Sequence, residues 1–237
     1  MSEWKQKRFW KEATTVATDT GWTVQLDGRS IKTPAKAALT LPTRSMADAI
    51  AAEWQAQDEV VNPMSMPFTR SANAAIDKVA VQHGEVADML AAYGDADLLC
   101  YRADTPEELV KRQADTWDPY LDWAAKTLGA RLSPRTGVIH ESQDAAALQS
   151  LSGRVHALNE FELAAFHDLV SLSGSLILGF AAAQDLHAAP IIWAASRVDE
   201  TWQEEQWGDD EEATEVAEIK KASFLHAKSF FDAAQTL

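Results

Sequence analysis

Residues 21–30 read Gly-Trp-Thr-Val-Gln-Leu-Asp-Gly-Arg-Ser, and this stretch decides the first part of the fold. Apolar and polar residues alternate in its first half, which is the pattern of a strand with one buried face. Asp27-Gly28 is a dipeptide that favours a two-residue hairpin turn. We therefore predict a small antiparallel sheet over residues 8–42, punctuated by prolines.

The period becomes helical after this sheet. Met46, Ile50 and Trp54 are spaced four apart, which places them on one face of a helix that Thr43 can cap. The sequence thus predicts that the β-rich segment ends in one helix.

A proline-bounded stretch at residues 63–67, Pro-Met-Ser-Met-Pro, predicts an extended linker. We place a domain boundary there, between a β-rich domain of residues 1–62 and a helical domain of residues 63–237. The expected class is α+β, with a small antiparallel amino-terminal domain and a larger all-helical carboxyl-terminal domain.

Helix starts are marked repeatedly in the second part of the chain. Cap and proline signals predict starts at Thr105-Pro106, Asp118-Pro119, Asn159, Ala189-Pro190, and Asp209 or Asp210. The uncharged stretch Leu169–Gln184 is too short to span a membrane and predicts a buried helix.

Composition excludes several classes of function. The 237 residues carry a formal net charge of −15, which argues against nucleic-acid binding, because that binding depends on clustered lysine and arginine. The single cysteine, Cys100, cannot form an internal disulfide or a zinc site of the cysteine type. We expect no metal, no cofactor and no membrane insertion.

Catalytic signatures are sparse. No glycine-rich phosphate loop occurs, and Ser173-Gly174-Ser175 lacks the nucleophile-elbow pattern, so close helix packing explains it better. His156 with Glu160 and His167 with Glu162 have the spacing of ligand or acid-base pairs, but such isolated pairs are more often ordinary contacts.

Tryptophan is abundant, with nine in the chain. Trp202 and Trp207 lie in a stretch between Arg197 and Lys220 that holds ten acidic residues and no basic one. Tryptophan is enriched among the residues that anchor protein interfaces. Two interpretations stay open, a partner-binding surface and a solvated helix face.

Collinear motifs across nearly the whole chain resemble the assembly chaperones of the ATP synthase alpha subunit, which occur in mitochondria and alphaproteobacteria. The matching pieces include Phe9-Trp10-Lys11-Glu12, Leu26-Asp27-Gly28-Arg29, Met66-Pro67-Phe68-Thr69-Arg70, Asp97-Leu98-Leu99, Tyr101-Arg102, Arg112-Gln113, Trp117-Asp118-Pro119 and Trp202-Gln203. The resemblance implies a holdase without catalysis that binds the free alpha subunit and prevents its aggregation until it pairs with beta.

The expected client-binding residues lie in one late segment. The resemblance carries over Glu200, Trp202, Gln203, Trp207 and Gly208, and we add Asp210 and Glu212 from the same acidic run. We expect a chaperone that acts without ATP and is a monomer when free. The amino terminus resembles no transit peptide, which favours the bacterial cytoplasm, with the mitochondrial matrix for eukaryotic relatives.

Two alternatives compete with a specific chaperone. One is an enzyme of unknown reaction with a site in the interdomain crevice; its candidate residues are Arg70, Asn73, Asp77, Asp97 and Arg102. These residues also suit a structural polar network, which we favour. The other alternative is an acidic adaptor without a specific client.

Overall fold

The computed structural model describes residues 7–137, 140–208 and 210–235. Contacts between residues group the chain into two compact units. The first extends to His83 and also includes Asn159–Ala165 and the end of the chain from Ser229; the second comprises Gly84–Leu158 and Phe166–Lys228. The predicted domain division at residue 63 stays a prediction, because contact grouping does not establish which parts fold independently.

The first unit contains the predicted antiparallel sheet, in the order β1 (Ala13–Thr18), β2 (Gly21–Leu26) and β3 (Arg29–Ser30). Leu26 pairs with Arg29, so Asp27 and Gly28 form the two-residue turn, and both have positive φ, 47° and 80°. Positive φ at both positions is the geometry of the hairpin turn that Asp-Gly favours. The Asp27 carboxylate accepts hydrogen bonds from the backbone N–H groups of Lys11 and Glu12, and the pKa of Asp27 is lowered by these bonds.

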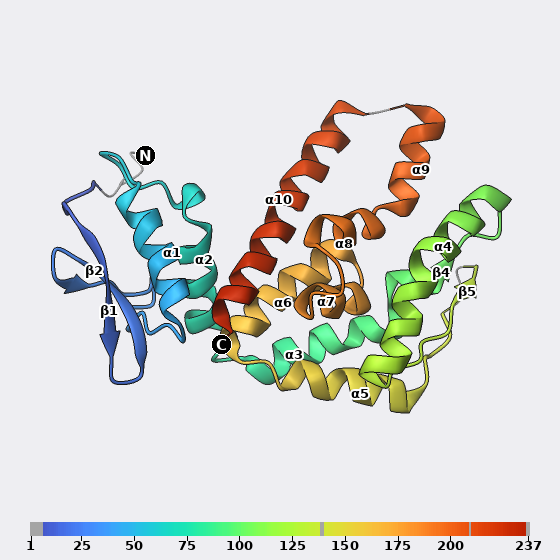
Figure 1. Ribbon diagram of the computed structural model, residues 1–237, viewed down its shortest axis with the longest axis horizontal. Coiled ribbons are helices and arrows are strands. Elements are labelled where there is room, and N and C mark those ends of the chain that lie inside the picture. The colour runs from blue at the N-terminus through green and yellow to red at the C-terminus, as the bar shows by residue number, and fades with distance from the viewer. Residues whose placement is uncertain (1–6, 138–139, 209, 236–237) are drawn as a thin grey trace. The chain divides into compact units, whose positions relative to one another are not determined.

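Helix α1 (Arg44–Gln55) lies along this sheet (Figure 1). Thr43 caps it by accepting a hydrogen bond from the Met46 N–H, as predicted. Met46 and Ile50 are fully buried, and the Trp54 ring packs against Trp10 with centroids 5.1 Å apart. The predicted helix and its buried face are confirmed.

The predicted extended linker is wrong. Pro63–Ser65 forms a short helix, η1, because the Asn62 side chain accepts a hydrogen bond from Met64 N and caps the turn. Helix α2 (Pro67–Ala74) follows at once and continues as η2 (Ala75–Val79). Proline at the first helical position fits both starts, since its missing N–H has no partner there in any helix.

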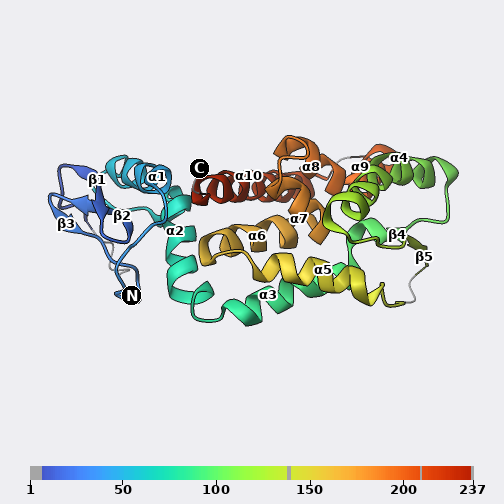
Figure 2. The same ribbon diagram turned by 60° about the horizontal axis from the view of Figure 1, so that its bottom comes forward.

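The rest of the chain is largely helical, which confirms the predicted α+β class. The helices that follow are α3 (His83–Ala91), η3 (Ala92–Ala96), η4 (Leu98–Cys100), α4 (Glu107–Trp123), η5 (Ala124–Leu128), α5 (Ala145–His156), α6 (Glu160–Ser173), α7 (Leu176–Ala183), α8 (Ala189–Ser196), α9 (Val198–Trp207) and α10 (Glu211–Ala234). Figure 2 shows α3 running beside α5, where the Asp88 carboxylate lies 2.8 Å from the His156 ring.

Helix α7 lies at the centre of the second unit, and all eight of its residues are buried. Phe180 packs on Phe166 with ring centroids 4.7 Å apart. A Cβ at Gly179 would lie 2.6 Å from Val170 Cγ2, so glycine there permits the close approach of α6 and α7 that the sequence predicted. The predicted single helix over Leu169–Gln184 is interrupted, because Gly174 takes φ +71° and ends α6.

Three predicted helix starts are confirmed, with cap hydrogen bonds at two of them. Asn159 accepts from Phe161 N and Glu162 N at α6, and Asp210 accepts from Glu212 N and Ala213 N at α10. Helix α8 begins at Ala189 with a proline in its first turn. Asp209, the other predicted start of α10, lies outside the described residues.

Two predicted starts in the α4 region need correction. Helix α4 begins at Glu107, with Pro106 rather than Thr105 at the cap position and no side-chain cap. Pro119 lies inside α4 instead of opening a helix. It is exposed, as is Asp115 one turn earlier, so water can bond to the Asp115 carbonyl that proline leaves unpaired.

Short strands also occur in the second unit. Tyr101–Arg102 (β4) pairs in parallel with Arg135–Thr136 (β5), a short exception to the predicted all-helical domain. Among the described residues, no helix is long and apolar enough to cross a membrane.

Candidate functional site

A hollow of about 780 Å³ opens on the second unit between the start of α4, strand β4 and helix α9. Figure 1 shows α9 beside the first half of α4. The large apolar side chains that line the hollow are Tyr101, Pro106, Leu109, Trp202 and Trp207; its polar lining includes Gln113, Gln203 and Gln206. Two predicted client-binding tryptophans therefore share one concave surface with Gln203.

Buried hydrogen bonds fix α9 against α4. The Gln113 amide, which is buried, donates to Asp199 Oδ1 at 2.6 Å and accepts from the Ala103 N–H at 2.9 Å. Trp117 donates its indole N–H to the Ala195 carbonyl at 2.7 Å, which ties α4 to the last turn of α8, directly before α9. Since each buried polar group has a partner, the wall of the hollow is held in one arrangement.

Arg112 holds the outer face of α9 through two kinds of contact. Its guanidinium lies 4.9 Å from the centre of the Trp202 ring and also forms two hydrogen bonds to the Glu205 carboxylate, at 2.9 and 2.8 Å. These hydrogen bonds lower the pKa of Glu205. Cation–π contact and bidentate pairing both restrict the orientation of Trp202.

More of the carboxylates in the acidic run are paired with arginines than the sequence implied. Arg197 pairs with Glu200 at 2.8 Å and lies 3.7 Å from Glu204, while Arg112 pairs with Glu205. The interpretation of Trp202 and Trp207 as lying among uncompensated carboxylates is therefore wrong for α9. Helix geometry and tertiary contact bring in the two arginines, one of them from a distant part of the sequence.

Trp207 ends α9 with 80% of its surface exposed, at the mouth of the hollow. Gly208 follows with φ +90°, and Asp210 caps the next helix. Glu212 is exposed in the first turn of α10. Tryptophan side chains are usually largely buried, and large exposed apolar side chains are typical of binding surfaces.

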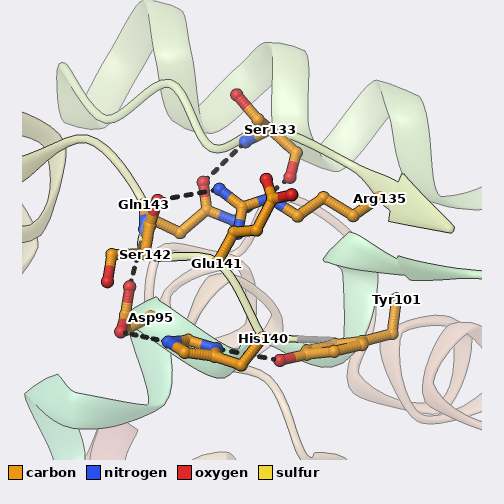
Figure 3. Close-up of polar contacts among 8 residues, drawn as sticks. All are labelled: Asp95, Tyr101, Ser133, Arg135, His140, Glu141, Ser142 and Gln143. Atoms are coloured by element: carbon orange, nitrogen blue, oxygen red, sulfur yellow. Dashed lines mark hydrogen bonds and ion pairs between the residues drawn. The ribbon is translucent and has the colours of Figure 1, made fainter. Parts of the chain in front are cut away.

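A network of polar contacts joins Asp95 and Tyr101 to residues around β5 and before α5 (Figure 3). His140 Nε2 lies 3.0 Å from Asp95 Oδ2, and its Nδ1 lies 3.4 Å from the Tyr101 hydroxyl. Gln143 bonds to Asp95 through its backbone N–H and to the backbone of Ser133 through its side chain. Because Tyr101 belongs both to this network and to the lining, the network positions one wall.

Similarity to known proteins agrees with the sequence resemblance. Residues 7–125 match the family model described as ATP12 chaperone protein. The chain belongs to the ATP12 chaperone family. The resemblance drawn from the collinear motifs to assembly chaperones of the ATP synthase is thereby confirmed.

Solved structures share this fold, and a further relative matches in sequence. Atp12 from Paracoccus denitrificans is 49% identical with a TM-score of 0.96, covering 98% of this chain and 100% of that one. Atu1473, a putative chaperone from Agrobacterium tumefaciens, is 40% identical with a TM-score of 0.91, covering 97% and 86%. The mitochondrial protein atp12 of Schizosaccharomyces pombe is 28% identical over 222 residues, which are 89% of this chain and 76% of that protein.

The residues predicted for an interdomain crevice divide between the two units of the ATP12-family chain. Arg70, Asn73 and Asp77 belong to the first unit, where Asp77 accepts hydrogen bonds from the Thr33 hydroxyl at 2.6 Å and from Ala35 N at 3.0 Å. These bonds tie η2 to the loop after β3. Arg70 is exposed, with Nη1 3.6 Å from the Met64 sulfur, and Asn73 is half-buried.

Asp97 and Arg102 belong to the second unit and have different partners. Asp97 is fully buried and accepts hydrogen bonds from Leu99 N, the Ser175 hydroxyl and Ile177 N, and burial raises its pKa to about 6. Arg102 donates to the Leu99 carbonyl and pairs with Asp118 at 2.8 Å. The raised pKa of Asp97 belongs to a carboxyl enclosed by donors, which does not line the hollow.

His156 and His167 contact aspartates rather than the glutamates noted from their spacing, in line with the favoured interpretation of ordinary contacts. His156 lies 2.8 Å from Asp88, and His167 lies 2.9 Å from Asp168, whose hydrogen bond raises the pKa of His167. Glu162 instead accepts a hydrogen bond from Asn159 N, as part of the helix cap. In the part of the chain that the structure describes, no cluster of three or more potential metal ligands occurs.

Sequence reasoning missed the α4 side of the hollow. Arg112 and Gln113 were quoted within a family motif, but neither was assigned a role. Leu109, Gln113 and Trp117 lie at helical spacing on one face of α4, and this pattern predicts a packed face without naming its partner. Pairing of α4 with α9 is a tertiary contact over more than eighty residues, which a single sequence does not encode locally.

Proposed function

We propose that this ATP12-family chain is a holdase for the free alpha subunit of the ATP synthase, which it keeps from aggregating until alpha pairs with beta. The observation that carries the proposal is Trp207, exposed by 80% at the mouth of an apolar hollow, in a chain that belongs to a chaperone family. A holdase needs an exposed apolar surface that its client covers.

Client recognition is assigned to the segment predicted from the sequence. Trp202 and Gln203 line the hollow together with Trp207, and Gly208 ends the helix that carries them. Glu200 is paired with Arg197 in the first turn of α9, whereas Asp210 and Glu212 are exposed and can meet a basic client surface.

Release follows from competition and requires no nucleotide. The chaperone binds the beta-facing surface of alpha more weakly than beta does, so beta displaces it by mass action. The sequence offers no glycine-rich phosphate loop for ATP hydrolysis. We propose that the chain is not an enzyme, acts as a monomer, and works in the bacterial cytoplasm, with the mitochondrial matrix as the compartment of eukaryotic relatives.

The test is suppression of aggregation. Alpha subunit diluted from denaturant is followed by light scattering, with the chaperone added in near-stoichiometric amount and without nucleotide. The chaperone should lower the scattering of aggregating alpha subunit but not that of beta subunit. Addition of ATP should not change either result. Equal protection of beta would favour a general adaptor, and a requirement for ATP hydrolysis would contradict the holdase mechanism.

A further inference from the structure

The hollow between α4 and α9 has a lining that defines the chemistry of its occupant. Its apolar wall comes from Pro106 and Leu109 on one side and from Trp202 and Trp207 on the other. Its volume of about 780 Å³ lies in the range of small-molecule pockets, roughly 300–1,000 Å³. Small-molecule sites enclose most of their ligand, whereas this hollow opens to solvent beside an exposed indole.

Two amides at its mouth indicate the backbone conformation of the occupant. Gln203 and Gln206 lie one helical turn apart on α9, both line the hollow, and both are exposed. Each amide offers a donor and an acceptor. An extended chain has backbone N–H and C=O groups free to pair with such amides, whereas the backbone groups within a helix are already bonded to one another.

The charge at the mouth is negative. Asp104, Glu107 and Glu108 are exposed beside Thr105 and Pro106, which line the hollow. The guanidinium in the lining, that of Arg102, is already bonded to the Leu99 carbonyl and to Asp118. A basic side chain of an incoming segment can therefore pair with the carboxylates at the start of α4.

We propose that this hollow binds an extended client segment that carries a large apolar side chain next to a lysine or an arginine. The apolar side chain packs between Leu109 and Trp207, the segment's backbone pairs with Gln203 and Gln206, and its cation faces Glu107 and Glu108. The inference rests on the proposed holdase function and names the kind of client segment that the site takes.

The experiment measures binding of overlapping peptides that span the ATP synthase alpha subunit. Peptides bound by the wild-type chain on an array are synthesised in soluble labelled form, and their affinities are measured by fluorescence anisotropy. Bound peptides should share an apolar residue next to a basic one. Trp207→Ala should weaken their binding about thirtyfold, as expected for loss of an anchoring tryptophan.

Charge reversal at the mouth has a matched control. Glu108→Lys should weaken binding by about threefold or more, with a flatter salt dependence. Glu85→Lys changes a comparable exposed acid in the first turn of α3, outside the lining, and should leave affinity within about twofold of wild type. Circular dichroism confirms that each variant is folded.

The two proposals fail in different ways. If wild type does not suppress aggregation of whole alpha subunit, the holdase function itself is wrong. If wild type suppresses aggregation but the bound peptides lack the apolar–basic pattern, or bind Trp207→Ala and Glu108→Lys as tightly as wild type, the assignment of this hollow is overturned while the function stands.

Discussion

Replacement of Asp97 by asparagine should remove a pH dependence from the stability of the second unit. The Asp97 carboxylate is fully buried, where it accepts hydrogen bonds from Leu99 N at 3.0 Å, the Ser175 hydroxyl at 2.7 Å and Ile177 N at 3.0 Å. Burial disfavours the charged form more than these donors favour it, so the pKa of Asp97 is raised to about 6 from its ordinary value of 3.8.

The sign of the effect follows from proton binding. Between these two pKa values the folded state binds a proton that the unfolded state has released, so the free energy of unfolding falls as pH rises. The contribution of Asp97 is therefore fully present below about pH 4 and is lost as pH rises through about 6. The difference between a pKa of 3.8 and one of about 6 corresponds to roughly 3 kcal/mol.

Urea unfolding of wild type and Asp97→Asn from about pH 4 to about pH 8 measures this term. The difference between the two free energies of unfolding should change by roughly 3 kcal/mol, with wild type losing stability relative to the variant as pH rises. An asparagine amide facing the Ile177 N–H adds a constant penalty, which does not alter the slope. Asp122→Asn, at an exposed site on α4, serves as the control. A difference that stays flat with pH would refute the reasoning.

Burial and packing give three further predictions. Trp207→Ala should leave the melting temperature nearly unchanged, because 80% of this side chain is exposed, whereas Trp117→Ala, at a fully buried site, should cost about 3–5 kcal/mol by thermal unfolding. Gly179→Ala should destabilise by about 1–3 kcal/mol in urea titrations, because its Cβ would lie 2.6 Å from Val170 Cγ2; an unchanged midpoint would show that α6 moves freely. Burial raises the pKa of the Cys100 thiol to about 12. Cys100 should therefore react with a thiol reagent only as fast as local unfolding exposes it.

Local patterns predicted the local structure well. The Asp27-Gly28 turn, the Thr43 cap and the Asn159 cap each depend on a few neighbouring residues, and each forms as expected. Errors arose where a local signal was overridden. Pro119 has the sequence signature of a helix start, yet exposure on α4 makes a proline tolerable in the helix interior.

The candidate site could be predicted only in part. Trp202 and Trp207 were singled out by composition, and their placement at one hollow agrees with that choice. The charge around them was misjudged, because Arg112 approaches from a helix far away in the sequence. Leu109 carried no signal of its own, since a leucine at helical spacing is indistinguishable from any core residue.

The first unit closes with residues from the far end of the chain, and this affects the order in which the protein can fold during synthesis. Phe230 packs on Phe68 with ring centroids 5.5 Å apart, and the Thr43 hydroxyl donates to the Ala233 carbonyl. The residues up to Ala233 must therefore be synthesised before Thr43 and Phe68 can complete their packing. Stalled or proteolysed chains that lack the residues from Ser229 onward would lack part of the core of the first unit. Folding of the first unit therefore depends on the last turns of α10.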